Sequence, residues 1–372
     1  MKHLVLIGGG HAHVQVLAAL AASPMPGVSV TLVSPYARQI YSGMLPGWIA
    51  GHYAIDQCAI RIDLLARRAG VGFVLASAVA LNLAARTVLC SNGETCAFDL
   101  ISIDCGPSVD LSNIPGATEH AIPIRPIEQF VAAWPALLEQ ARQSTDGFRV
   151  AIAGDGAAGT ELAFALQARF ASENLHQASV SLIGSHDAPL AGFPGALRRK
   201  ALTLLSREGI HCIPQCRVLA ALPGALRLSD GRRFAADASL IVTGAAAPAW
   251  PADSGLATDA GGFIQVSRTL QSRSHPFVFA AGDIAAYADP RPKSGVFAVR
   301  AGPPLAGNLR AALAGQALQP WVPQPHALYL ISTGKRYALA SRASLTASGH
   351  WVWRWKDWID RRFMRRFEVR QG

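Results

Sequence analysis

The stretch RVAIAGDGAAGTELAFALQARF (149–170) decides the fold class of this chain. It begins as a short apolar strand, turns at the spaced glycines Gly154, Gly156 and Gly159, and continues as a helix rich in alanine and leucine. Glycines at this spacing permit a tight turn, a close backbone approach to a pyrophosphate and close packing of the helix on the strand. With the apolar run ASVSLIGS (178–185), the stretch predicts the strand–helix–strand unit of a dinucleotide-binding fold.

A second copy of this unit opens the chain. HLVLI (3–7) predicts a buried strand, the glycines at 8–10 a turn, residues 13–22 a helix, and VSVTLVS (28–34) the next strand. This copy is less regular, because His13 stands where a third glycine is expected and Ser34 where an acid usually binds a ribose hydroxyl. The sequence therefore predicts an α/β protein with two Rossmann-like dinucleotide-binding domains.

Shorter runs predict the remaining elements. Strands are expected at 72–75, 87–90, 100–104 and 239–244 and in FVFAAGD (277–283), and helices at 127–141 and 300–312. Pro115-Gly116 indicates an exposed linker, with a domain boundary at 119–126. Three strand-like stretches near 327, 336 and 350, followed by a basic helix, predict a small C-terminal β plus helix region.

Composition limits the functional classes. The 372 residues are 51% hydrophobic and 16% charged, which suits a large core and excludes a disordered or fibrous chain. The net charge of +10 favours an anionic partner, but no nucleic-acid-binding module accompanies it, so we expect no nucleic-acid partner. Six cysteines without a CxxC pair indicate a reducing, cytoplasmic location. No run approaches the roughly 20 apolar residues of a membrane span.

Longer motifs connect the chain with a known family. GGGHAHV (8–14), YSGMLPGWIAGHY (41–53), GDGAAGTELA (154–163), AAGDIAAY (280–287), PRPKSGVFAVRAGP (290–303) and WRWKDWIDRRFMRRF (353–367) are the stretches concerned. With them the chain resembles the pyridine nucleotide-disulfide oxidoreductase superfamily, its type II NADH dehydrogenase-like branch, and most closely the flavoproteins found free-standing or fused N-terminally to selenide, water dikinase. The resemblance implies a discontinuous FAD-binding domain (1–122 and 259–325), an NAD(P)-binding domain (123–258) and a C-terminal interface region (326–372).

By that resemblance, Gly8 and Gly10 would bind the FAD pyrophosphate and Asp283 the flavin ribitol. An aspartate there could instead only cap the following helix. His11 and His13 have no further metal ligands nearby, so we expect them to pack against FAD and expect no metal. The other FAD contacts expected are Ser34, Gly43, Met44, Val79, Cys105, Gly106, Gly282, Lys293 and Phe297. For Lys293, a solvated side chain is the alternative.

The nicotinamide site would lie on the second glycine turn. Glu161 matches a glutamate kept near the nicotinamide in related NADH dehydrogenases and is the expected catalytic residue, although an acid is also favoured in the first turn of any helix. Ser185 replaces the acid expected after the second strand, which leaves NADH or NADPH as the cofactor. The expected contacts are Gly154, Gly156, Gly159, Thr160, Ser185 and Gly244.

Gly43, Met44 and Pro46 stand where disulfide reductases of the superfamily carry redox-active cysteines. A dithiol relay is therefore not expected, and electrons would pass from FAD to a quinone or another small acceptor. A sulfide:quinone oxidoreductase is one alternative, but it needs a cysteine in the C-terminal third, and none follows Cys216. We expect Cys212 and Cys216 to share one strand and to be structural. A second alternative is a non-catalytic flavin module that partners selenide, water dikinase.

The C-terminal segment combines aromatic and basic residues. Residues 354–370 carry seven Lys or Arg, and four of the eight tryptophans lie at 351, 353, 355 and 358. Indoles with cations are typical of a membrane-surface element. The segment could dock on a membrane surface, or it could form a homodimer or partner contact, and the sequence does not decide between them. Because Trp351, Trp353 and Trp355 alternate, we expect a strand that leads into a short helix.

Overall fold

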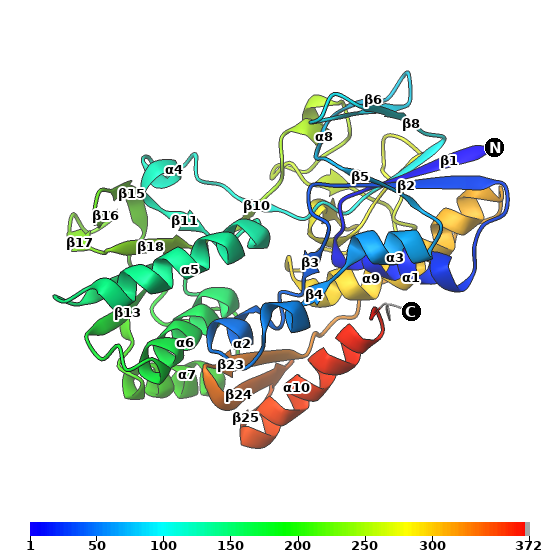
Figure 1. Ribbon diagram of the computed structural model, residues 1–372. Helices are drawn as coiled ribbons and strands as arrows, with labels where there is room; N and C mark the ends of the chain where they lie inside the picture. Colours follow the sequence, from blue (N-terminus) through cyan, green and yellow to red (C-terminus); the bar gives the residue numbers. More distant parts are fainter. Residues whose placement is uncertain (369–372) are drawn as a thin grey trace.

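The computed structural model describes residues 1–368, so residues 369–372 of the expected C-terminal region lie outside the described part. The first of two five-stranded parallel sheets has the order β21 (Val278–Ala280), β9 (Leu100–Ile103), β1 (Lys2–Ile7), β2 (Val28–Ser34) and β5 (Gly72–Leu75). Helices α1 (His11–Ala22) and α9 (Gly295–Leu313) pack together beside it (Figure 1). The N-terminal strands and a strand near residue 280 thus share one sheet.

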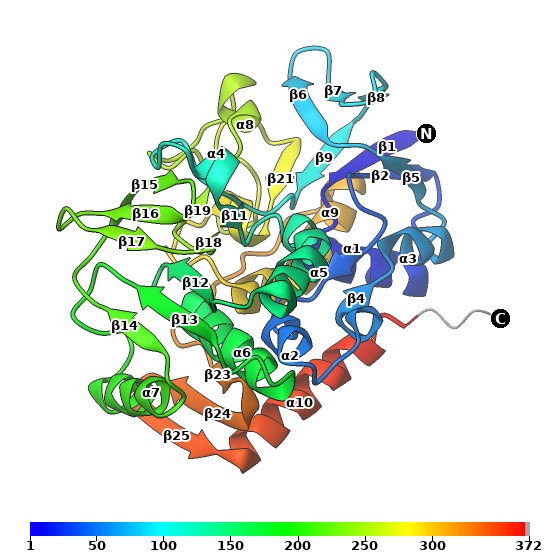
Figure 2. The same cartoon turned by 60° about the vertical axis from the view of Figure 1, so that its left-hand side comes forward.

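The second parallel sheet is built around the stretch 149–170. Its order is β11 (Ile122–Pro123), β18 (Ala238–Ile241), β12 (Phe148–Ala153), β13 (Ala178–Ile183) and β14 (His211–Ile213). Helices α5 (Ile127–Gln143), α6 (Ala157–Ser172) and α7 (Gly195–Arg207) accompany this sheet (Figure 2). Both predicted strand–helix–strand units, and with them the α/β fold class, are confirmed.

Smaller elements complete the molecule. Two antiparallel three-stranded sheets are β6 (Ala78–Asn82), β7 (Thr87–Cys90), β8 (Thr95–Ala97) and β15 (Val218–Leu222), β16 (Ala225–Leu228), β17 (Arg233–Ala235). The short helices are α2 (Leu45–Ile49), η1 (Ile55–Cys58), α3 (Ile62–Arg68), α4 (Ala117–His120), α8 (Trp250–Asp253) and η2 (Gly282–Ile284). The two-stranded pairs are β3 (Gln39–Ile40) with β4 (Ala59–Ile60), β10 (Ser108–Val109) with β19 (Ala245–Ala246), and β20 (Ile264–Gln265) with β22 (Ala285–Ala286).

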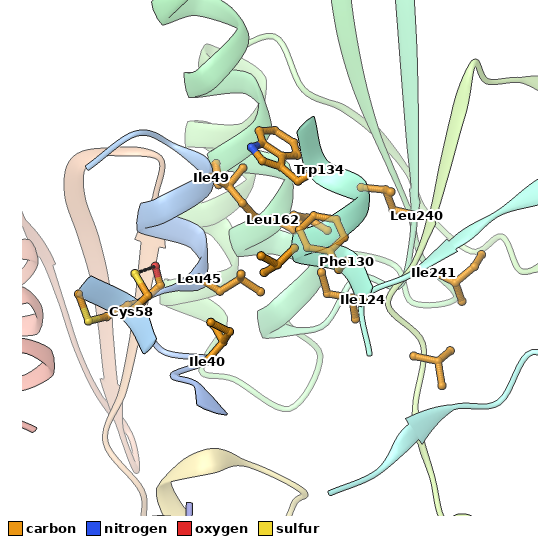
Figure 3. Packing of buried hydrophobic residues seen from close by; sticks show 14 of the residues in the cluster. Ile40, Leu45, Ile49, Cys58, Ile124, Phe130, Trp134, Leu162, Leu240 and Ile241 are labelled. Carbon is orange, nitrogen blue, oxygen red and sulfur yellow. Dashed lines mark hydrogen bonds between the residues drawn. The ribbon is translucent and has the colours of Figure 1, made fainter. Parts of the chain in front are cut away.

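One apolar cluster joins the segments that carry the two sheets. Figure 3 shows Ile40 and Leu45, from β3 and α2, beside Phe130 of α5 and Leu162 of α6. Apolar burial contributes about 25 cal/mol per Å² removed from water, so this contact favours one fixed arrangement of the two halves. The antiparallel pair β10–β19 also links them, and each of its strands follows closely on a glycine, Gly106 or Gly244.

The C-terminal expectation of a strand carrying the tryptophans is wrong. An antiparallel sheet of β23 (Tyr329–Thr333), β24 (Lys335–Arg342) and β25 (Leu345–Gly349) ends before them, and all four tryptophans lie on one helix, α10 (His350–Arg365). The alternation of tryptophans concealed a helical period. Val352, Lys356, Phe363 and Phe367 are buried at spacings of four and seven residues, as one helix face requires.

Cys212 and Cys216 do not share a strand. Strand β14 ends at Ile213, because Pro214 has no N–H to donate and Gln215 has a φ of +54°. Both thiols are free, and the Cys216 Sγ lies 3.0 Å from the Asp230 carboxylate. The expected structural role of these cysteines is consistent with this placement.

The third glycine of the second turn has a packing role that can be tested. A Cβ on Gly159 would lie 1.8 Å from the Gly154 carbonyl oxygen, whereas a Cβ on Gly156, where φ is −70°, meets nothing within 4 Å. We expect Gly159→Ala to lower the free energy of unfolding by about 1–3 kcal/mol through overpacking, measured from the urea unfolding midpoint. Gly156→Ala is the matched control and should unfold like the wild type. An equal loss in both variants would contradict this role.

Candidate active site

The first glycine turn is built around a buried carboxylate that the sequence analysis missed. Asp104, at the end of β9, accepts hydrogen bonds from the backbone N–H groups of Ala12 and His13 at 2.8 and 2.9 Å. A Cβ on Gly10 would lie 2.4 Å from this carboxyl group, and a Cβ on Gly282 would lie 2.2 Å from it. Burial raises the pKa of Asp104 to about 8. The only feature of the sequence that could have indicated Asp104 is its place directly after an apolar strand.

The two histidines of the turn have different surroundings. His13 is fully buried, and its ring nitrogens lie 2.7 Å from the Gly8 carbonyl and 2.8 Å from the Ser102 hydroxyl. His13 therefore supports the turn from inside, and both of its ring nitrogens already have partners in the protein. In contrast, the buried Nε2 of His11 has no hydrogen-bond partner among residues 1–368. Burial and the nearby Arg125 lower the pKa of His11 to about 4.

Asp283 lies in η2, near the start of α9, and faces two cations. Its carboxylate is 3.4 Å from the Arg125 guanidinium, which comes from the segment before α5. Burial raises the pKa of Asp283, while Arg125 and Lys293 oppose that shift. The Lys293 side chain is partly buried: its ammonium donates to the Ala285 carbonyl at 2.6 Å and lies 3.8 Å from the centre of the Phe263 ring. Arg125 is a second residue that no sequence pattern indicated.

The other residues expected at the FAD site divide by exposure. Phe297 is buried in the first turn of α9, and the Ser34 hydroxyl donates to the Tyr36 carbonyl at 3.0 Å. Cys105 is exposed at the end of β9, and a Cβ on Gly106 would meet open space. Val79 is exposed on β6, so its side chain is not part of the buried group.

A second polar group lies where α10 crosses the loop before α2. The buried Lys356 ammonium donates to the Gly43 carbonyl and pairs with the Asp360 carboxylate at 2.7 Å. Met44, the neighbour of Gly43, is only 1% exposed. Burial, together with the charge of Asp360, raises the pKa of the Tyr41 phenol. The i,i+4 pair on one helix face was present in the sequence, but its loop partner was not predictable.

Glu161 joins this second group from α6. One oxygen of its carboxylate accepts the Ser332 N–H at 2.8 Å, and burial raises its pKa to about 7, with Lys356 opposing the shift. Lys356 of α10 thus connects the two places: its charge acts on Glu161, and its ammonium donates to the Gly43 carbonyl. The Tyr41 ring connects this group with His11, whose ring centre is 5.6 Å away.

The second glycine turn offers a separate cradle. Gly154 has a φ of +122°, and a Cβ on Gly156 or Gly244 would meet open space. Thr160 is buried, with its hydroxyl 3.4 Å from the Asp155 carbonyl, and Ser185 is exposed beyond β13. Helix α6 therefore points its N-terminus at open space, which suits a pyrophosphate.

These features accommodate two dinucleotides. The unpartnered His11 nitrogen, the open space at Gly106 and the carboxylate of Asp283 suit FAD beside the first turn. The open space at Gly156 suits a nicotinamide dinucleotide beside the second.

Comparison with known proteins agrees with this geometry. Residues 2–302 match the model of the pyridine nucleotide-disulphide oxidoreductase family. The chain belongs to this family. It is 25% identical over 290 residues to an NADH dehydrogenase-like protein of Bacillus subtilis, covering 77% of each chain. An NADH dehydrogenase-like protein of Mycobacterium tuberculosis is 28% identical over 63% of this chain and 61% of its own length. This chain is thus an oxidoreductase of a family that uses FAD and a nicotinamide dinucleotide.

Solved structures show the same fold across nearly the whole chain. The sulfide:quinone oxidoreductase of Aquifex aeolicus superposes with a TM-score of 0.82 at 18% identity, over 99% of this chain and 91% of that one. NDH2 from Plasmodium falciparum, solved with NADH, gives 0.82 at 12% identity over 98% of both chains. Within residues 1–368, no helix has the length and apolar character needed to span a membrane.

The raised pKa of Glu161 predicts a pH-dependent stability difference. The ordinary pKa is 4.5 and the folded value about 7, so the unfolded chain loses this proton first and stability falls as pH rises through that window. We expect Glu161→Gln, relative to the wild type, to gain about 2 kcal/mol between pH 5 and pH 7.5, measured by urea unfolding. Glu94→Gln, on an exposed turn, is the control and should show no such gain. A pH-independent difference for Glu161→Gln would exclude this titration.

Proposed function

We propose that this protein is an FAD-dependent NAD(P)H oxidoreductase that passes electrons to a quinone without a redox disulfide. FAD, when bound, supplies the redox chemistry of accepting a hydride and releasing electrons. The protein would position the cofactors, stabilise the charge that develops on them and exclude water from the site. Family membership and relatives named NADH dehydrogenase-like support the proposal.

The residues of the first site would orient FAD. The Asp283 carboxylate can accept hydrogen bonds from ribitol hydroxyls, and Arg125, 3.4 Å away, limits the cost of keeping that carboxylate charged. The free Nε2 of His11 is a further polar contact for a cofactor beside α1. Arg125 would also place a positive charge near the cofactor, where negative charge grows on reduction.

We propose that electrons pass directly from FAD to the quinone, because no thiol pair lies beside Gly43 and Met44. The thiol nearest this loop is Cys58, whose Sγ lies 3.9 Å from the Met44 carbonyl. It is buried, burial raises its pKa to about 12, and all six cysteines of the chain are free. A lone thiol with a raised pKa is a poor nucleophile and cannot form a local disulfide. No cysteine follows Cys216, which also disfavours sulfide oxidation.

Glu161 would serve the acceptor by holding a proton. Reduction of a quinone to a quinol consumes two protons, and a carboxyl group with a pKa of about 7 can donate and recover a proton near neutral pH. Its neighbour Lys356 touches the Gly43 carbonyl, so the proton-holding group and the flavin-side loop share one buried contact.

Helix α10 would bring the protein to the membrane in which a quinone dissolves. Its outward face carries Trp351, Trp355 and Trp358, which are 58%, 39% and 51% exposed. Exposed arginines at 354, 362 and 365 lie on the same side. The inward face of the helix carries the buried Lys356 and Phe363, and Lys356 contacts the Gly43 carbonyl. Figure 2 shows α10 running past α2 and β24. Indoles favour the membrane interface and arginines favour anionic lipid, so one helix would separate the lipid surface from the site.

Flavin reduction tests the proposed reaction. We expect the purified protein to be yellow with bound FAD, and we expect a nicotinamide dinucleotide to bleach the flavin absorbance under anaerobic conditions. A water-soluble ubiquinone analogue should then restore the absorbance at a rate faster than without acceptor. Glu161→Gln should slow this second step by about tenfold or more and flatten its pH dependence near 7. Bound FAD that neither NADH nor NADPH reduces would refute the proposed function.

Vesicle binding tests the role of α10. We expect sedimentation with vesicles containing about 30% phosphatidylglycerol to fall at least tenfold when Trp351, Trp355 and Trp358 are all changed to Ser, because interfacial burial of indoles and of the helix face is lost. The control changes two other exposed apolar residues, Leu89 and Leu219, to Ser and should bind like the wild type. If the wild type ignores vesicles and the triple variant only converts a dimer to a monomer, this face is a subunit contact instead.

A further inference from the structure

The end of β13 lacks the acidic side chain that usually binds the adenosine ribose. In dinucleotide-binding units, an acid at this point accepts hydrogen bonds from the ribose hydroxyls, and its charge disfavours a 2′-phosphate. Here the strand ends at Ile183 and continues as Gly184, Ser185 and His186. From the sequence alone, this end of the strand therefore leaves the choice between NADH and NADPH open.

A carboxylate nevertheless occupies this place, supplied by the glycine turn. A Cβ on Gly184 would lie 2.0 Å from Oδ2 of Asp155, the residue between Gly154 and Gly156. The Asp155 side chain thus lies directly against the backbone at the end of β13, in space that only a glycine leaves free. Asp155 is 7% exposed, and its carbonyl oxygen accepts the Leu190 N–H at 2.8 Å, which fixes the residue in this position.

The charges around Asp155 do not suit a 2′-phosphate. Its carboxylate has one side-chain partner within the described part of the chain, His186, at 3.1 Å, and that imidazole is half exposed. Arg198, a guanidinium that contacts the segment after His186, already pairs with Asp187 and also donates to the Ala188 carbonyl at 3.0 Å. A dinucleotide on the second turn would therefore meet an acceptor carboxylate, beside a segment whose Arg198 is already paired.

We infer that Asp155 selects NADH over NADPH by accepting the adenosine ribose hydroxyls and repelling a 2′-phosphate. This inference rests on the proposed function only in that the second glycine turn binds a nicotinamide dinucleotide. The carboxylate comes from the turn and not from the strand end, and Gly184 is the residue that makes room for it. The half-exposed His186 side chain can rotate away, which leaves Oδ1 of Asp155 free to accept a hydrogen bond from a ribose hydroxyl.

The test uses ligands that need no flavin chemistry. Isothermal titration calorimetry of the FAD-loaded protein with ADP-ribose and with 2′-phospho-ADP-ribose measures the ribose subsite directly. We expect the wild type to bind ADP-ribose at least 30-fold more tightly. Asp155→Asn keeps the shape and removes the charge, and should lower this ratio at least tenfold. Asp146→Asn is the matched control, because it removes one charge from an exposed loop before β12, at the opposite end of that strand from the glycine turn, and it should leave the ratio within about threefold of the wild-type ratio.

The possible outcomes separate this inference from the proposed function. Equal affinity of the wild type for both ligands, or an unchanged ratio in Asp155→Asn with a wild-type thermal midpoint, overturns the role of Asp155. Binding that appears only after Asp155→Asn also overturns it, because the carboxylate would then block the subsite. If the wild type prefers ADP-ribose but neither NADH nor NADPH bleaches its flavin, the proposed oxidoreductase function fails while the ribose selectivity stands.

Discussion

The hydrogen bonds from the first turn of α1 to Asp104 hold together three segments that are far apart in the sequence. The carboxylate follows β9, its two N–H donors begin α1, and Gly282 after β21 packs against it. An acceptor is needed there because the first N–H groups of a helix have no partner within the helix. Gly10 and Gly282 are required as much by this carboxylate as by any ligand, since a Cβ on either would collide with it. A Cβ on Gly8 would collide with the backbone of Asp104 and Cys105. The cofactor-facing end of the first sheet depends on this one contact.

The two dinucleotide-binding units were predictable because each is a local pattern. Residues 149–170 and 3–34 contain their strand, turn and helix signals within a short window, and the structure has these elements within a few residues of the expected limits. The same windows also indicated Gly8, Gly10, Gly154, Gly156 and Gly159. The C-terminal helix was misjudged because an alternation of tryptophans competed with the helical spacing of the buried residues.

The site residues that the sequence did not indicate all act through distant partners. Asp104 acquires its role from residues about 90 positions away, and Arg125 from Asp283, 158 positions away. Lys356 reaches Gly43 across 313 positions. The local sequence around each of these side chains shows no motif, so only the tertiary contact reveals its role at the site. Asp155 differs, because its neighbour Gly156 and the strand-end Gly184 were both visible, but only the geometry shows that one makes room for the other.

Helix α10 has a further consequence for the chemistry at the covered site. Lys356 and Phe363 lie between the Gly43–Met44 loop and the outside, and Arg366 ties the end of the helix to Gln15 at 3.2 Å. Dioxygen is small and apolar, and it can oxidise a reduced flavin only when it can approach the ring. A helix closed over this loop would therefore govern how many electrons are lost to hydrogen peroxide, and any ligand or lipid that lifts the helix would change that loss.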